Sequence, residues 1–196
     1  MHITADASEI ALILQRPGSV VAYPTETFYG LGSRIDDPEG LMRIISAKGR
    51  DASKGMIILV PDLESACSIA GMDTRQKTFL GRFWPGPLSA LLPAGEHIDP
   101  LLAPEGKVAL RVSPHPLALA LTRAAGPITS TSANPAGEAP ATTPDEIAAG
   151  CLDIDAILDG GKTPGGKPST LVDLTSWPPV ILREGVIPKT AVLEAL

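Results

Sequence analysis

Short apolar runs, each bounded by glycine, proline or other turn-forming residues, recur along the whole chain and limit its fold more than any other feature. The run MIILVP at 56–61 is continuous and too short for a stable helix, which is typical of a strand with both faces buried. The 19 glycines and 20 prolines are scattered without a period, which indicates many tight turns. The sequence predicts strands at 19–24, 56–61, 87–93, 107–112, 127–132, 154–158, 170–174 and 179–183.

Segments with apolar residues at helical spacing lie between these runs. The clearest is 38–48, whose inner stripe includes Leu41 and Ile44. A capping box formed by Thr143 and Glu146 predicts the start of another helix. Further helices are predicted at 5–15, 62–70, 73–83, 115–125 and 189–195. Because helices and strands mix without a strict βαβ repeat, the sequence predicts one α/β domain over residues 1–196, with a twisted mixed sheet flanked by helices.

Charge and cysteine content narrow the functional classes. The net charge of −6 argues against a broad nucleic-acid-binding face, although it leaves room for a local basic pocket. Cys67 and Cys151 are far apart and lack a CxxC partner, so we expect neither a zinc site nor a disulfide. No signal peptide and no apolar run of the roughly 20 residues that a membrane helix needs are visible, so the sequence predicts a cytoplasmic protein without a membrane contact.

The segment YPTETFYGLG at 23–32 places polar residues at the end of a predicted strand. Thr25 and Thr27 alternate onto the same side of an extended chain, where two hydroxyls could bind a small polar ligand. Gly30 and Gly32 predict a sharp turn that lets the backbone come close to such a ligand. The alternative is a strand end whose hydroxyls are satisfied within the protein.

Two further segments combine charge or hydroxyls with small residues. In AKGRDASKG at 47–55, Lys48 offers a point charge and Arg50 a planar fork for phosphate oxygens, unless the run is only a solvated helix end. In TSTSANPAG at 129–137, Ser132 and Asn134 could hydrogen-bond a ligand, and exposed N–H groups of such a turn can hold an anion. A hydroxyl-rich turn with no ligand is the alternative for this segment, which is not a Walker loop.

Two arginines lie within apolar strand runs, Arg111 in VALRV and Arg183 in VILREG. Burying an arginine among valine, leucine and isoleucine is costly unless the charge is paired. Each arginine therefore has either a structural carboxylate or an anionic ligand in a cleft as its expected partner.

The sequence shows no catalytic nucleophile. Its three histidines lie in unrelated contexts, and no G-x-S-x-G elbow is present. Phosphate binders and hydroxyls without a nucleophile suit an enzyme that positions charged substrates, one of which supplies the nucleophile.

Seven segments in order resemble the YrdC-type threonylcarbamoyl-AMP synthases, in their short single-domain bacterial form. They are PTETFYGLG (24–32), KGR (48–50), FWPGPLSALLP (83–93), VALRVSPHP (108–116), PITSTSAN (127–134), PSTLVDL (168–174) and LREG (182–185). The resemblance implies an α/β sheet around a large concave cleft. It also implies that L-threonine, bicarbonate and ATP, with Mg²⁺, give threonylcarbamoyl-AMP and pyrophosphate for the threonylcarbamoyl-adenosine modification of tRNA.

The resemblance also implies roles for individual residues. Lys48 and Arg50 would be catalytic. The nucleotide-binding residues would be Lys48, Arg50, Ser132, Asn134, Thr142 and Arg183. The threonine-binding residues would be Thr27, Arg111, Ser132 and Ser169. No protein-borne metal site is implied.

This chain departs from the family pattern at Lys54, where an asparagine is frequent, and at Lys107, where a threonine is frequent. It ends soon after LREG, so we expect no second C-terminal domain and expect separate partner proteins to transfer the threonylcarbamoyl group to tRNA. A weak contact with tRNA or other RNA is a further expected interaction. Two other functions remain open at this point: an RNA-binding or ribosome-maturation module, and a carbamoyl-transfer domain that uses carbamoyl phosphate.

Overall fold

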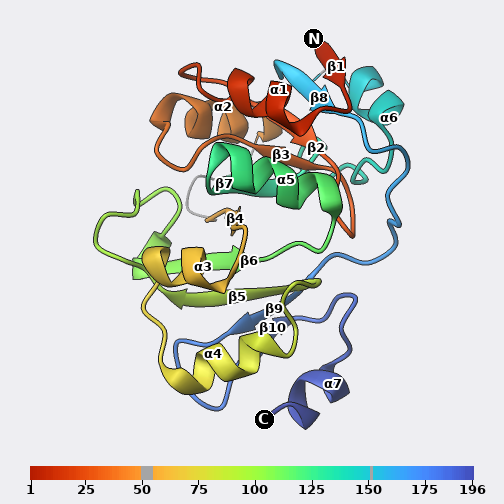
Figure 1. Cartoon of the computed structure of the whole chain (residues 1–196). Helices are drawn as coiled ribbons and strands as arrows, with labels where there is room; N and C mark the ends of the chain where they lie inside the picture. Colours follow the sequence, from red (N-terminus) through yellow and green to blue (C-terminus); the bar gives the residue numbers. More distant parts are fainter. Residues whose placement is uncertain (50–54, 151) are drawn as a thin grey trace.

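A single mixed sheet forms the centre of the molecule (Figure 1). The computed structural model describes residues 1–49, 55–150 and 152–196. Within these ranges ten strands form the sheet in the order β1-β8-β2-β3-β7-β4-β6-β5-β9-β10. They are β1 (His2–Thr4), β2 (Val21–Tyr23), β3 (Gly30–Gly32), β4 (Ile57–Leu59), β5 (Leu88–Pro93), β6 (Lys107–Arg111), β7 (Ile128–Ser132), β8 (Ala156–Leu158), β9 (Thr170–Asp173) and β10 (Val180–Arg183). Parallel pairs such as β4–β6 adjoin antiparallel pairs such as β5–β6, which confirms the predicted fold class.

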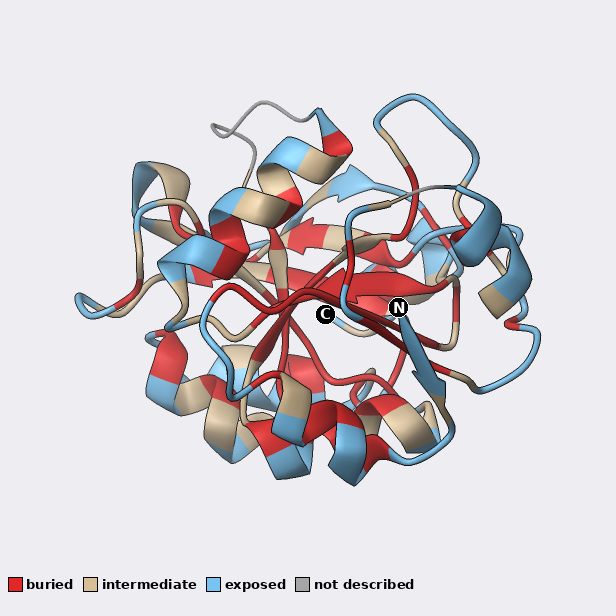
Figure 2. Cartoon of the chain, turned by 90° about the horizontal axis from the view of Figure 1, so that it is seen from above, coloured by how far each residue is buried: buried red, intermediate tan, exposed pale blue. Residues whose placement is uncertain are grey.

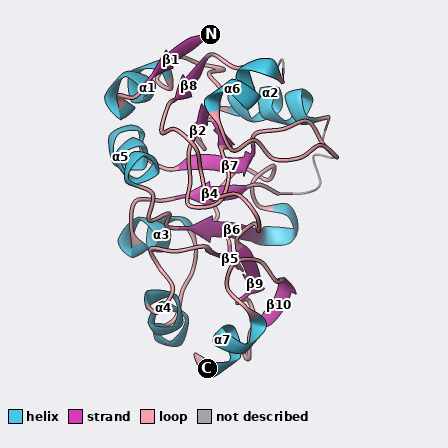
Figure 3. Cartoon of the chain, turned by 90° about the vertical axis from the view of Figure 1, so that its right-hand side faces the viewer, coloured by secondary structure: helices cyan, strands magenta, loops and turns pink. Residues whose placement is uncertain are grey.

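Helices lie on both sides of the stacked strands, with α1, α5, α3 and α4 on one side and α2 and α6 on the other (Figure 3). They are α1 (Ala7–Ile13), α2 (Pro38–Lys48), α3 (Leu63–Ile69), α4 (Thr74–Gly81), α5 (Pro116–Ala125), α6 (Pro144–Ala149) and α7 (Lys189–Glu194), with a 3₁₀ turn at Pro104–Gly106. The helices predicted at 5–15, 38–48, 62–70, 73–83, 115–125 and 189–195 are all present, with small differences at their ends.

The core has two clusters, and the larger one includes buried residues of α2, α3 and α4. The smaller cluster packs α1 and α5 against the sheet through Ile10, Leu121 and Ile128, all of which are fully buried. Each such side chain contributes roughly 1.5–3 kcal/mol through the surface it removes from water. Figure 2 shows the buried residues running through the middle of the molecule, with the exposed ones on the outer faces of the helices.

Helix α2 ends at Lys48, one of the candidate site residues. Asp37 caps its first turn by accepting a hydrogen bond from Gly40 N, and it also accepts one from Gly18 N. Gly49 ends the helix with a φ of 57°, a left-handed conformation that glycine adopts without steric cost. This termination places Lys48 in the last turn, beside the sheet.

Two local predictions need correction. Gly30 and Gly32 do not form a sharp turn, because they lie in strand β3, which pairs with both β2 and β7. A Cβ on Gly32 would lie 2.7 Å from the Tyr23 ring, so glycine is needed here for close packing of strands. The capping box is only half formed: Thr143 caps α6, but the Glu146 carboxylate accepts from Thr142 N. Strand β1 was not predicted from the sequence.

Candidate active site

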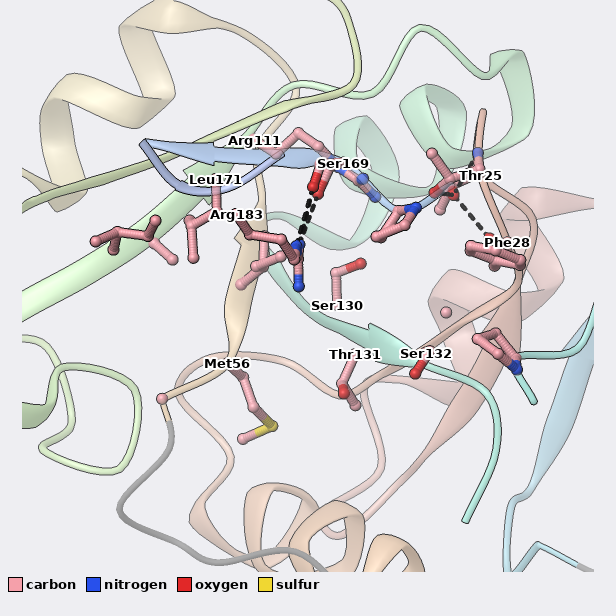
Figure 4. A pocket seen from close by; sticks show the side chains of 18 of the residues that line it. Thr25, Phe28, Met56, Arg111, Ser130, Thr131, Ser132, Ser169, Leu171 and Arg183 are labelled. Atoms are coloured by element: carbon pink, nitrogen blue, oxygen red, sulfur yellow. Dashed lines mark hydrogen bonds between the residues drawn. The ribbon is translucent and has the colours of Figure 1, made fainter. Parts of the chain in front are cut away.

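A cleft of about 1170 Å³ opens along the sheet and gathers the polar segments that the sequence singled out. Its walls come from the loop before β3, the end of α2, strands β6, β7, β9 and β10, and the loop before β9. Seven of the sequence-predicted residues line it: Thr27, Lys48, Arg111, Ser132, Asn134, Ser169 and Arg183. Figure 4 shows Arg111, Ser169 and Arg183 on one side of the cleft and Ser130 facing them from β7. The geometry therefore brings together residues from both ends of the chain.

The threonine-rich loop forms one end of the cleft. The hydroxyls of Thr25 and Thr27 lie 3.1 Å apart, which confirms that the two side chains point the same way. Thr25 Oγ1 also donates to Phe28 O at 2.7 Å (Figure 4). The loop at 159–169 is attached here, because Gly165 N donates to Thr27 O at 2.7 Å. Thr25 thus fixes the loop, while Thr27 faces the cleft.

Lys48 is buried and holds the loop that follows β7. Its ammonium donates to the carbonyl oxygens of Ser132 at 2.5 Å and Asn134 at 2.7 Å. The backbone completes the attachment, because Ala136 N donates to Lys48 O at 2.9 Å. The Ser132 and Asn134 side-chain oxygens also lie within 3.5 Å of the ammonium. The positive charge therefore sits directly beneath the hydroxyl- and amide-bearing loop.

The Asn134 side chain shapes the same loop. Its amide nitrogen donates to Pro135 O at 2.8 Å and to Glu138 O at 2.7 Å. These bonds curl the backbone around the side chain, so the Asn134 amide group stabilises the conformation of the loop. Ser132 remains partly accessible at the cleft wall.

Arg111 is buried in β6 and has a carboxylate partner. Its Nη1 lies 3.4 Å from Glu26 Oε1, so the structural carboxylate expected for a strand arginine is present. The same arginine also lines the cleft, so the two expectations for it are compatible.

Arg183 has only neutral partners among the contacts described. Its Nε and Nη2 donate to Ser169 O at 3.2 and 3.0 Å, and Nη2 lies 3.3 Å from Ser169 Oγ. Ser169 is itself buried and bonds to Ser89 Oγ at 2.9 Å. Partial burial lowers the pKa of Arg183, and the nearby charge of Arg111 lowers it further. Two guanidinium groups close together and one of them without a carboxylate make this part of the cleft suited to an anion.

The hairpin that carries Arg183 is fixed by Thr170. The Thr170 hydroxyl donates to Ile187 O at 2.6 Å and accepts from Gly185 N at 2.9 Å. A Cβ on Gly185 would lie 2.1 Å from Pro168 O, so only glycine allows this close approach. The loop before β9 and the turn after β10 therefore form one unit.

Some predicted residues lie elsewhere. Thr142 lines a second cavity of about 280 Å³, which shares Asn134 with the main cleft. Arg50 and Lys54 lie outside the described residues.

Lys107, where the chain departs from the family pattern, does line the cleft, and its ammonium pairs with the Asp173 carboxylate at 3.0 Å.

Sequence reasoning missed three residues of the site. Ser130 lines the cleft, and its position two residues before Ser132 on the same strand was the available signal. Glu26 and Ser113 lie behind Arg111 and bond to each other, with Ser113 Oγ 2.5 Å from Glu26 Oε2. No local pattern connects residues 87 positions apart.

The cleft offers little to a protein-bound metal ion. Among the described residues no group of three or more His, Cys, Asp or Glu side chains could hold one. Glu105 and Asp173 are the carboxylates lining the described cleft, and Asp173 is paired with Lys107. Cys67 is a free thiol, and Cys151 lies outside the described residues. In the described part of the chain no helix is long and apolar enough to cross a membrane.

Known proteins resemble this chain in both sequence and fold. The Sua5_yciO_yrdC family model, described as telomere recombination, matches residues 14–185. A threonylcarbamoyl-AMP synthase of Chromohalobacter salexigens is 40% identical over 179 residues, which cover 90% of this chain and 97% of the relative. A threonylcarbamoyl-AMP synthase of Bacillus subtilis is 40% identical over 185 residues, but this chain spans only 53% of its length.

A solved structure has the same fold as this chain. The crystal structure of Pyrococcus abyssi Sua5 complexed with L-threonine superimposes with a TM-score of 0.91 at 36% identity, covering 97% of this chain and 57% of that one. The family match spans most of the sequence, and the fold agrees over almost all of it. The chain therefore belongs to the Sua5/YciO/YrdC family.

Proposed function

We propose that this protein is a threonylcarbamoyl-AMP synthase, which forms threonylcarbamoyl-AMP and pyrophosphate from L-threonine, bicarbonate and ATP. One observation carries the proposal: the cleft joins a lysine-held loop of hydroxyl and amide groups to an arginine pair, over a threonine-rich loop. A relative named threonylcarbamoyl-AMP synthase matches almost end to end, which supports the same activity.

The reaction needs no protein nucleophile. The amine of threonine and bicarbonate form a carbamate with loss of water. A carbamate oxygen attacks the α-phosphorus of ATP, the bond to the β-phosphate oxygen breaks, and pyrophosphate leaves. Holding the reactants in line can lower the barrier by roughly 7–11 kcal/mol at best.

The nucleotide occupies the side of the cleft formed by the loop after β7. Ser132 and Asn134 present the polar groups, and Lys48 holds them in place and supplies positive charge. Arg183 faces the same space and offsets negative charge on the phosphates as it shifts to the leaving group. Arg50 and Thr142 complete the proposed nucleotide set, in which Arg50 is a second catalytic residue in addition to Lys48.

Threonine occupies the opposite side. Thr27 contacts its polar groups, Arg111 binds its carboxylate, and Ser169 and Ser132 lie between the two substrates. The serine hydroxyls can bond either reactant without adding charge. Mg²⁺ enters with ATP, held by phosphate oxygens, because Mg²⁺ commonly uses substrate phosphates and few protein carboxylates.

We further propose that the protein acts in the cytoplasm and that separate proteins transfer the threonylcarbamoyl group to tRNA, with weak contact to RNA by this chain. The unstable adenylate benefits from a cleft that limits water. The two other functions differ in what they consume. An RNA-binding module turns over no nucleotide, and a carbamoyl-transfer domain consumes carbamoyl phosphate.

The test measures pyrophosphate released from ATP in bicarbonate and Mg²⁺, with L-threonine, with L-serine, or with neither. We expect release that depends on threonine and that falls at least roughly 100-fold in Arg183→Ala or Arg50→Ala, since each removes a charge that stabilises the transition state. Arg123→Ala, on the exposed face of α5, is the matched control and should keep wild-type activity. Consumption of carbamoyl phosphate, or RNA binding without any pyrophosphate release, would replace the proposal.

A further inference from the structure

An ion pair behind the cleft contains two buried polar atoms without a hydrogen-bond partner. Across the described ranges, the buried side-chain atoms without a hydrogen-bond partner are Glu26 Oε1, Ser33 Oγ and Arg111 Nε. Two of them belong to the Glu26–Arg111 pair, in which Arg111 Nη1 lies 3.4 Å from Glu26 Oε1, too far for a good hydrogen bond. Incomplete bonding of a buried charged pair is costly. Such a pair is therefore expected to serve a purpose other than stability.

The carboxylate of Glu26 is held from behind. Ser113 Oγ donates to Glu26 Oε2, and His115 N in turn donates to Ser113 Oγ at 3.2 Å. One carboxylate oxygen is thus fixed by the segment after β6, and the other is presented to Arg111. Ser113 is 3% exposed, so this arrangement is shielded from water.

Glu26 does not itself line the cleft, whereas Arg111 does. The position of Glu26 restricts where the guanidinium can lie, and its charge offsets that of Arg111. Arg183, on the same side of the cleft as Arg111, has only neutral described partners. The three charged groups together leave about one positive charge for the anions that bind in this part of the cleft.

We propose that Glu26 is a positioning residue: it orients Arg111, through a carboxylate fixed by Ser113, so that the guanidinium binds the carboxylate of the amino-acid substrate. The assignment rests on the proposed function, since it takes threonine as the ligand. It adds a residue that acts only through Arg111.

The experiment is a double-mutant cycle on threonine binding, measured by calorimetry with the full chain, together with melting temperatures. Glu26→Gln keeps the shape and removes the charge, and should weaken L-threonine binding roughly tenfold, as expected for a buried charge pair that loses one partner. In an Arg111→Gln background the same change should cost nothing further. A purely structural role would instead lower affinity by the same factor in both backgrounds, and that result would overturn the proposal, as would unchanged binding in Glu26→Gln.

A second variant covers the case in which Glu26→Gln does not fold. Ser113→Ala leaves both charges in place and frees the carboxylate, so a loss of roughly threefold that disappears with Arg111→Gln supports the proposal. Equal loss in both backgrounds contradicts it. The pyrophosphate assay separates the two levels: wild-type protein that fails to release pyrophosphate refutes the synthase, whereas active wild type with uncoupled Glu26 and Arg111 refutes only this inference.

Discussion

The ammonium of Lys48 is bonded to the backbone carbonyls of Ser132 and Asn134, 84 and 86 residues further along the chain. A lysine proposed to bind a nucleotide is usually expected to contact phosphate directly. Here two of its three N–H donors hold the protein backbone. The side chain therefore shapes the loop as well as charging it.

The first prediction concerns Lys48→Met. Removing the ammonium leaves two carbonyls without their donor, so the free energy of unfolding should fall by roughly 1–3 kcal/mol. Amide hydrogen exchange at 132–136 should rise, because the loop loses its attachment. Urea denaturation and exchange measured by mass spectrometry test both effects.

Lys77→Met, on the exposed face of α4, is the matched control and should change neither quantity. If Lys48→Met abolished pyrophosphate release while exchange in the loop stayed at the wild-type level, the lysine would act on the nucleotide alone.

The second prediction concerns Gly32 in β3. A Cβ at this position would lie 2.7 Å from the ring of Tyr23 and 2.8 Å from Thr129 O. Gly32→Ala should therefore destabilise the protein by roughly 1–3 kcal/mol through overpacking between central strands. Thermal unfolding monitored by circular dichroism measures the loss.

Gly81→Ala provides the opposite case, because nothing lies within 4 Å of the added Cβ and the residue is in helix α4. It should be neutral or stabilising by up to about 1 kcal/mol. Equal melting temperatures for the two variants would show that the sheet tolerates a methyl group beside Tyr23.

The third prediction concerns the contact of Arg183 with Ser169. The guanidinium reaches the Ser169 carbonyl with two nitrogens, and a lysine cannot reproduce this fork. Arg183→Lys should raise the KM for ATP roughly tenfold, and Arg183→Ala should raise it further. Steady-state pyrophosphate release at varied ATP tests the order. A lysine variant with wild-type KM would show that charge alone is used.

The fourth prediction concerns pH. His115 caps α5 because its Nδ1 accepts a hydrogen bond from Leu117 N, which requires the neutral ring. Burial lowers the pKa of His115, and the charge of Glu26 raises it by less. A lowered folded-state pKa means that the stabilising contribution is present above the usual histidine pKa of about 6.5 and is lost as pH falls through the folded-state value.

Urea midpoints measured between about pH 7 and pH 5 should therefore fall more steeply for the wild type than for His115→Asn. Asparagine can cap the helix without titrating. Parallel pH profiles for the two proteins would exclude this histidine as a source of the pH dependence.

Apolar patterning anticipated most of the architecture, and its failures have identifiable causes. Helix 38–48 was placed correctly because its inner stripe and its glycine stop are both local signals. Strand β3 was missed because Gly30 and Gly32 have low strand propensity and are kept by contacts with Tyr23 and β7. The strand at His2–Thr4 has exposed residues and no alternation, and it exists through pairing with β8.

The residues of the candidate site also fall into two groups, those that the sequence could predict and those that it could not. Thr27 and Ser132 lie in segments whose composition already suggested ligand binding, and both line the cleft. The sequence could not reveal that Glu26 pairs with Arg111, because the two residues are far apart along the chain and only the tertiary fold brings them together. The contribution of Arg50 stays a prediction.

The sheet order also determines when during synthesis the protein can work. Strand β1 pairs with β8, near residue 156, and Arg183 lies in β10, the final strand at the far edge. A nascent chain thus holds β1 without its β8 partner until residues 156–158 have been made, and it lacks part of the described cleft until Arg183 has left the ribosome. Such distant pairings slow folding. They also mean that a prematurely terminated chain could not acquire a complete cleft, however well its earlier strands assembled.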